Sequence, residues 1–251
     1  MRTDPDALMI FAAGFGTRMG ALTADRPKPL IEVAGRALLD HALDIAKAAG
    51  VGRIAVNLHY RADQIAAHLA GRSGILLSRE PDRILETGGG LRHALPHLGE
   101  GPVFTINSDA VWTGPNPLET LRAGWQPGMG ALLLLAPPDR LRGHSGQGDF
   151  RMDAQGRITR CPKGAAGLVY LGAQIIDPQG LASIAEEVFS LNLLWDAMIA
   201  QGRAFGILHP GGWCDVGHPE GIAEAEAMLR EADRQGTGRQ GADRLGAGDV
   251  S

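Results

Sequence analysis

A chain of 251 residues is long enough to bury a sizeable core as one α/β domain without disulfide support. Lys and Arg total 24 against 28 Asp and Glu, and the net charge of -4 excludes the basic surface that nucleic-acid binding requires. The N-terminus lacks a secretory pattern, and no apolar run approaches the roughly 20 residues that span a bilayer. We therefore expect a cytoplasmic protein with neither a nucleic-acid nor a membrane partner.

Short apolar runs alternate with segments of helical periodicity. Buried strands are expected at residues 8–13, 54–58, 75–77, 103–107 and 131–136. Helices are expected at residues 37–49, 62–69, 90–97, 117–124, 191–201 and 219–234. This alternation predicts an α/β fold with a doubly wound, mostly parallel sheet.

From Asp149 onward, short strand-like segments replace the alternation of apolar runs and helical segments. Strand-like pieces at residues 150–152, 157–159 and 167–176 predict a small β-rich lobe, within residues 140–215, that closes over the carboxyl edge of the sheet. After Arg234 the chain is rich in glycine and polar residues, so we expect one domain over residues 1–234 and a disordered tail at 235–251. No hexapeptide repeat is visible, which argues against an added acyltransferase module.

A glycine-rich loop follows the first strand and reads AAGFGTRMG at residues 12–20. Glycines at the carboxyl end of a strand let backbone N–H groups turn toward an anion, so this loop is a candidate phosphate-binding site. Two common phosphate-binding motifs are absent. The dinucleotide fingerprint requires glycine where Met19 stands and an acidic residue where Asn57 stands, and no Gly-Lys dipeptide of a triphosphate-binding P-loop occurs.

Two cations accompany the loop. Arg18 belongs to it, and Lys28 follows between Pro27 and Pro29, which restrict the backbone on both sides. A guanidinium can hold phosphate through two hydrogen bonds, whereas a lysine acts as a point charge. Both residues are candidate catalytic groups for a polyphosphate substrate, and the alternative is that they are solvated surface charges.

Two aspartates follow apolar segments at positions where ligand binding is expected. Asp109 ends the segment VFTINSD, and Asp215 lies in the turn GWCDVGH. Two carboxylates can share one Mg²⁺, whose octahedral shell is completed by water and phosphate oxygens. Taken singly, either aspartate can equally be a turn residue or a helix cap.

The segments AAGFGTRM and PKPL, at residues 12–19 and 27–30, resemble the signature of the sugar-1-phosphate nucleotidyltransferase family. The segments around Asp109 and Asp215 also match, and the resemblance covers approximately residues 8–230. It implies that Arg18 and Lys28 act on the reacting phosphates and that Asp109 and Asp215 hold Mg²⁺. One departure is Gly20-Ala21, where relatives often have Arg-Pro. The residues implied to contact the nucleotide are Ala12, Ala13, Gly14, Gly16, Thr17, Gly88 and Asn107.

The implied substrates are an NTP and a sugar 1-phosphate. Within the family, the chain is most similar to N-acetylmuramate 1-phosphate uridylyltransferases, which favours UTP, and a guanylyltransferase or cytidylyltransferase using GTP or CTP is the alternative. Mannose or heptose 1-phosphate would be the sugar of the guanylyltransferase. Gly148, Asp149 and Gly172 match positions where relatives contact the sugar. A non-catalytic nucleotide-sugar sensor on the same fold is a further alternative, and the sequence leaves association into a homo-oligomer open.

Overall fold

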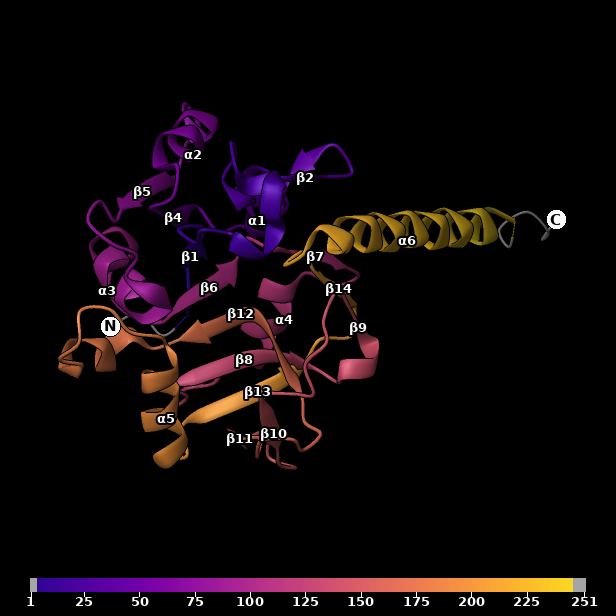
Figure 1. The fold of residues 1–251 in the computed structure, drawn as a ribbon. Coiled ribbons are helices and arrows are strands. Elements are labelled where there is room, and N and C mark those ends of the chain that lie inside the picture. The colour runs from indigo at the N-terminus through magenta and orange to yellow at the C-terminus, as the bar shows by residue number, and fades with distance from the viewer. Residues whose placement is uncertain (1–3, 246–251) are drawn as a thin grey trace.

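A seven-stranded sheet forms the centre of the computed structural model, which describes residues 4–245 (Figure 1). In spatial order its strands are β13 (Ala204–Leu208), β8 (Ala131–Ala136), β12 (Val169–Ile176), β6 (Val103–Asn107), β1 (Ala7–Phe11), β4 (Arg53–Leu58) and β5 (Ile75–Arg79). In this sheet β12 alone runs antiparallel to its neighbours, β6 and β8, and the other adjacent pairs are parallel. The prediction of an α/β fold with a mostly parallel sheet is confirmed.

Helices cover both faces of the sheet. Because side chains alternate across a strand, Leu8 and Ile10 of β1 enter one core while Ala7 and Met9 enter another. The first core also takes side chains from α1 (Leu38–Ala48), α2 (Ala62–Leu69) and α4 (Pro117–Gly124). The second takes side chains from α3 (Glu86–Leu98) and α5 (Asn192–Ala200). Each face of the sheet is therefore packed against helices.

The strand β12 does not lie in a separate lobe, where the sequence places residues 167–176. It lies inside the central sheet, and all of its residues except Tyr170 are buried. A strand with apolar residues on both faces is stable only where both faces are covered. The part of this region that does form a small sheet of its own is the hairpin of β10 (Phe150–Met152) and β11 (Ile158–Arg160).

A three-stranded sheet joins distant parts of the chain, in the order β7 (Ala110–Thr113), β14 (Gly212–Asp215) and β9 (Leu141–Arg142). Asp215 pairs with Ala110, which directly follows Asp109. The pairing of β14 with β7 therefore brings the two candidate metal ligands to the same place. The remaining short elements are β2 (Glu32–Val33), β3 (Arg36–Ala37) and the 3-10 helices Thr17–Thr23, Lys28–Leu30, Pro138–Arg140 and Pro178–Ser183.

The last helix, α6 (Pro219–Leu245), extends beyond the sheet (Figure 1). It begins where the sequence predicts a helix, but its backbone continues through residues 235–245, which the sequence assigns to a disordered tail. Helical hydrogen bonds join residues only four positions apart, so a polar, glycine-containing sequence does not by itself exclude a helix. Residues 246–251 of the expected tail lie outside the described residues. No helix found within residues 4–245 is long and apolar enough to cross a membrane.

Candidate active site

A cavity of about 410 Å³ opens at the carboxyl ends of β1, β4 and β6. Its walls come from the glycine loop, the segment after β6 and the first turn of α3. The cavity contains every predicted nucleotide contact except Gly88, and it also contains Arg18, Lys28 and Asp109. The lining residues are 11–18, Lys28, Pro29, Asn57, Ile84, Glu86, Thr87, 107–109 and Gly217.

The glycine loop closes directly over Lys28. Gly16 has a φ of 65°, in the left-handed region that favours glycine, and a Cβ added there would lie 2.8 Å from the Cβ of Lys28. The Thr23 hydroxyl donates to the carbonyls of Gly16 and Gly20 at 3.2 and 3.1 Å. Met19 is buried in a core with residues of α1 and α6. The loop backbone is therefore held from several sides before any ligand binds.

Lys28 points its ammonium group toward a carboxylate. Its side chain is almost wholly buried, and Nζ donates to Asp109 Oδ2 at 2.7 Å. A buried lysine retains its charge most readily beside an opposite charge. The ion pair thus holds a positive charge at the wall of the cavity.

The Asp215 carboxyl lies close enough to Asp109 for the two charges to interact. Burial raises the pKa of Asp215, and the negative charge of Asp109 raises it further. The charges of Lys28, Arg18 and His144 act in the opposite direction but do not cancel this shift. The raised pKa therefore reflects first the burial of the Asp215 carboxyl and then its proximity to Asp109.

The Arg18 guanidinium reaches the same place from the glycine loop. Its Nη1 donates to Nε2 of His218 at 3.2 Å. A Cβ added to Gly217 would lie 3.0 Å from both terminal nitrogens of Arg18 and 2.8 Å from Oδ2 of Asp215. Glycine at position 217 therefore leaves room for the carboxylate and the guanidinium on either side of it.

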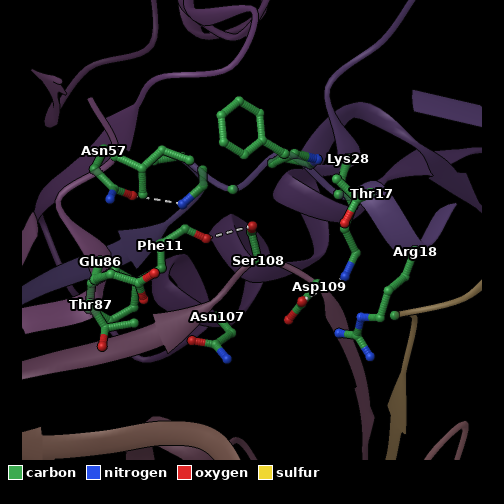
Figure 2. Close-up of a pocket in the computed structure, with 18 residues that line it drawn as sticks. Phe11, Thr17, Arg18, Lys28, Asn57, Glu86, Thr87, Asn107, Ser108 and Asp109 are labelled. Carbon is green, nitrogen blue, oxygen red and sulfur yellow. Dashed lines mark hydrogen bonds and ion pairs between the residues drawn. The ribbon is translucent and has the colours of Figure 1, made fainter. Parts of the chain in front are cut away.

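Figure 2 shows that the cavity has two chemically different ends. Arg18, Lys28 and Asp109 lie at one end, and Asn57, Glu86 and Thr87 lie at the other. Between them, the Ser108 hydroxyl donates to the carbonyl of Phe11 at 2.7 Å and ties the end of β1 to the segment after β6. An elongated ligand with one anionic end would match this arrangement.

Gly88 is not among the residues that line the cavity. Gly88, Gly89 and Gly90 form a glycine cluster, and the sequence predicts a helix only from residue 90, whereas α3 begins at Glu86 and contains all three glycines. The amide of Gly88 donates to the carbonyl of Phe189 at 2.9 Å, and an added Cβ would lie 2.4 Å from the Phe189 ring. In the structure Gly88 thus permits close packing of α3 against the segment before α5.

The residues expected to contact the sugar lie outside the cavity lining. The Oδ2 of Asp149 accepts a hydrogen bond from the amide of Tyr170 at 2.9 Å, and a Cβ on Gly148 would collide with the backbone of Gly167. Gly172 lies next to the cavity, since a Cβ there would be 2.8 Å from Nδ2 of Asn107. Of the three residues, only Gly172 touches a lining side chain in this way.

Residues 8–245 match the family described as the MobA-like NTP transferase domain. The chain belongs to this family. A protein from Caulobacter vibrioides named N-acetylmuramate alpha-1-phosphate uridylyltransferase is 43% identical, over 92% of this chain and 100% of that protein. A protein of the same name from Neisseria meningitidis is 34% identical, over 88% of this chain and 96% of that protein.

Solved structures share the fold of this NTP transferase. HddC from Yersinia pseudotuberculosis has a TM-score of 0.72 at 20% identity, covering 89% of this chain and 99% of that one. The same protein has been solved in complex with GMP-PN. At this identity the likeness shows the fold alone.

The NTP transferase cavity also contains residues that sequence reasoning missed. Phe15 is half exposed, and its ring meets those of His59 and Tyr60 edge-on. Glu86 has a φ of 63°, which is unusual for a residue other than glycine and is a form of strain often found at binding sites. Its position just before the glycine cluster is a sequence signal for Glu86, but no sequence pattern reveals the backbone strain.

Proposed function

We propose that this NTP transferase is a sugar-1-phosphate nucleotidyltransferase that transfers UMP from UTP to N-acetylmuramate 1-phosphate and releases pyrophosphate. The observation that carries the proposal is that Arg18, Lys28 and Asp109 line one end of the cavity and that the Asp215 carboxyl, although not part of the lining, lies close enough to interact with all three. The choice of UTP and of the sugar rests on the names of the Caulobacter and Neisseria relatives.

Asp109 and Asp215 are the residues that would hold Mg²⁺. Burial raises the pKa of the Asp215 carboxyl and the negative charge of Asp109 raises it further, and a divalent cation shared by the two carboxylates would relieve the repulsion between them. No group of three or more His, Cys, Asp and Glu gathers among the described residues, so Mg²⁺ held by these two aspartates would need its other ligands from water and phosphate. When bound, Mg²⁺ would supply charge neutralisation to the phosphates.

The remaining chemistry requires alignment rather than a new nucleophile. A phosphate oxygen of the sugar 1-phosphate is already anionic at neutral pH, so it can attack the α-phosphorus of UTP without a general base. The new P–O bond forms as the bond from the α-phosphorus to the α,β-bridging oxygen breaks, and pyrophosphate leaves with that electron pair. Arg18 and Lys28 stabilise the negative charge on the phosphates during this in-line displacement.

The opposite end of the cavity would receive the nucleoside. With the triphosphate beside Arg18 and Lys28, the base lies toward Asn57 and Thr87. This orientation assigns the glycine loop, including Gly14 and Gly16, to the phosphates between the two ends.

A screen for pyrophosphate release tests the proposal. The four NTPs are each combined with N-acetylmuramate, mannose, heptose and glucose 1-phosphates in the presence of Mg²⁺. The expected result is turnover with UTP and N-acetylmuramate 1-phosphate. Turnover with GTP and mannose 1-phosphate instead would replace the proposed substrates, and no release from any pair would overturn the proposed reaction class.

A further inference from the structure

A buried glutamate lies behind the nucleoside end of the cavity and has no role in the mechanism above. Glu80, between β5 and α3, is 2% exposed. Its Oε1 accepts a hydrogen bond from Asn57 Nδ2 at 2.8 Å, and its Oε2 accepts one from the amide of Leu85 at 2.9 Å. The ion pairs formed among the described residues do not include Glu80. Each carboxylate oxygen is thus used by a neutral N–H donor.

The hydrogen bonds continue from Glu80 into the cavity wall. Asn57, at the end of β4, is 4% exposed, and its Oδ1 accepts a hydrogen bond from the amide of Ala12 at 2.7 Å. Ala12 and Asn57 both line the cavity, and Leu85 directly precedes the lining residue Glu86. One carboxylate therefore connects the start of the glycine loop, the end of β4 and the first turn of α3.

The backbone of α3 passes close to the hydrogen bond between Glu80 and Asn57. A Cβ added to Gly90 would lie 2.9 Å from Oε1 of Glu80 and 3.0 Å from Nδ2 of Asn57. The third glycine of the cluster therefore allows α3 to pass over the hydrogen bond between the two side chains. The Glu80 carbonyl also accepts a hydrogen bond from His59 at 2.6 Å, and the His59 ring contacts Phe15 in the glycine loop.

We propose that Glu80 is a positioning residue, which acts through Asn57 and Leu85 to hold the nucleoside end of the cavity in its binding geometry. This inference rests on the proposed function, because it assumes that the cavity binds a nucleoside triphosphate. Glu80 itself touches neither substrate. Its loss weakens nucleotide binding and leaves the binding of the sugar phosphate and the transfer step nearly intact.

The hydrogen bonds accepted by residues 57 and 80 predict which substitutions keep every donor satisfied. A backbone amide can only donate, so Ala12 requires an oxygen from residue 57 and Leu85 requires an oxygen from residue 80. In Glu80→Gln, the one amide oxygen can serve Leu85, but the new amide nitrogen then faces Nδ2 of Asn57, and two donors oppose each other. In the double variant Asn57→Asp/Glu80→Gln, the new carboxylate at position 57 accepts from the backbone amide of Ala12 and from the side-chain amide at position 80, and every donor is satisfied again.

The test measures UTP binding by calorimetry with Mg²⁺ and without sugar phosphate, together with kcat and both KM values. Glu80→Gln is expected to weaken UTP binding and raise the KM for UTP by about 10-fold or more, since a hydrogen bond to a charged group is lost. The KM for the sugar phosphate and kcat should stay within about 3-fold. The double variant should bind UTP more tightly than Glu80→Gln alone, because every donor is satisfied again, while the change at the lining residue Asn57 keeps its Kd from serving as a copy of the original value. Asp40, on α1 and outside the cavity, accepts hydrogen bonds from His68 and Arg72, and Asp40→Asn serves as the control with unchanged UTP binding.

Unchanged UTP affinity in Glu80→Gln would overturn the inference, as would a lower melting temperature accompanied by normal affinity. If Glu80→Gln does not fold, the double variant decides: a folded protein that binds UTP supports the proposed hydrogen-bond pattern, and an unfolded protein or one without measurable UTP binding contradicts it. The binding measurement also separates the two proposals. UTP binding that depends on Glu80, in a protein that releases no pyrophosphate with any sugar 1-phosphate, would overturn the proposed function and leave this inference standing.

Discussion

Lys28 Nζ and Asp109 Oδ2 are 2.7 Å apart, although 81 positions separate the two residues in the chain. The ion pair lets the protein bury a lysine at the wall of an anion-binding cavity without leaving its charge unpaired. An arriving polyphosphate would meet an ammonium group whose position is already set. Preorganised charge of this kind stabilises a transition state more than a charge that must first move into place.

Lys28→Ala is expected to lower kcat by about 10²-fold, because one preorganised charge at a transition state is typically worth about 3 kcal/mol. The measurement is steady-state pyrophosphate release, with a melting curve to confirm folding. Lys47→Ala, on the exposed side of α1, is the matched control and should retain normal turnover. A near-normal kcat for Lys28→Ala would remove Lys28 from the reaction.

Asp215→Asn is expected to stabilise the metal-free protein at neutral pH while it abolishes Mg²⁺-dependent turnover. Because burial and the charge of Asp109 raise the pKa of Asp215 in the folded state, its ionisation opposes folding. The stability associated with the protonated carboxyl is present below the unfolded pKa, about 4, and is lost as the pH rises through the higher folded pKa. Urea unfolding in EDTA at pH 7 should therefore give a larger free energy of unfolding for Asp215→Asn than for the original chain. This difference in free energy should shrink toward acid pH.

Asp40→Asn should show the opposite sign in the same unfolding experiment. Burial raises the pKa of the Asp40 carboxyl, but hydrogen bonds and charges from His68 and Arg72 lower it by more, so the net shift is downward. Its ionised form stabilises the fold above the unfolded pKa, and that contribution is lost as the pH falls through the lower folded pKa. Equal responses of Asp40→Asn and Asp215→Asn at pH 7 would contradict the assigned directions.

Gly217→Ala is expected to reduce turnover by at least about 10-fold with little loss of stability, because a small misplacement of reacting groups has a large effect on rate. The new Cβ would press on the ends of Asp215 and Arg18, which can move aside but then leave their positions beside the cavity. Gly52→Ala is a suitable control, since an added Cβ there meets open space. The expected result is a lower kcat at an unchanged melting temperature. Full activity would show that the room left by Gly217 for Asp215 and Arg18 is not required for turnover.

Gly88→Ala distinguishes packing from nucleotide contact at that position. In an open helix this substitution stabilises by about 1 kcal/mol, but here the Cβ would meet the ring and the carbonyl of Phe189, and such overpacking typically costs about 1–3 kcal/mol. Urea unfolding should show a net loss of stability. Unchanged stability combined with a raised KM for UTP would instead support the direct contact with the nucleotide that the family resemblance implies.

Features that depend on neighbouring residues follow directly from the sequence. The predicted ranges 62–69 and 117–124 coincide with α2 and α4, and 103–107 and 131–136 coincide with β6 and β8. The loop from Ala12 to Arg18 is identifiable because its glycines, cation and position after a strand all lie within one short segment. Hydrophobic periodicity and turn-forming residues act over a few positions, so they can be identified from the sequence alone.

Contacts between distant segments could not be read in this way. The pairing of β14 with β7 places Asp215 beside Asp109, the insertion of β12 between β6 and β8 changes the centre of the sheet, and Glu80 joins Asn57 to Leu85. Each depends on surfaces that are buried only after the chain has folded, and the free energy of those contacts depends on which segments meet. Many segments of similar composition could satisfy the same local rules, so the partners are selected by the packing of the whole domain.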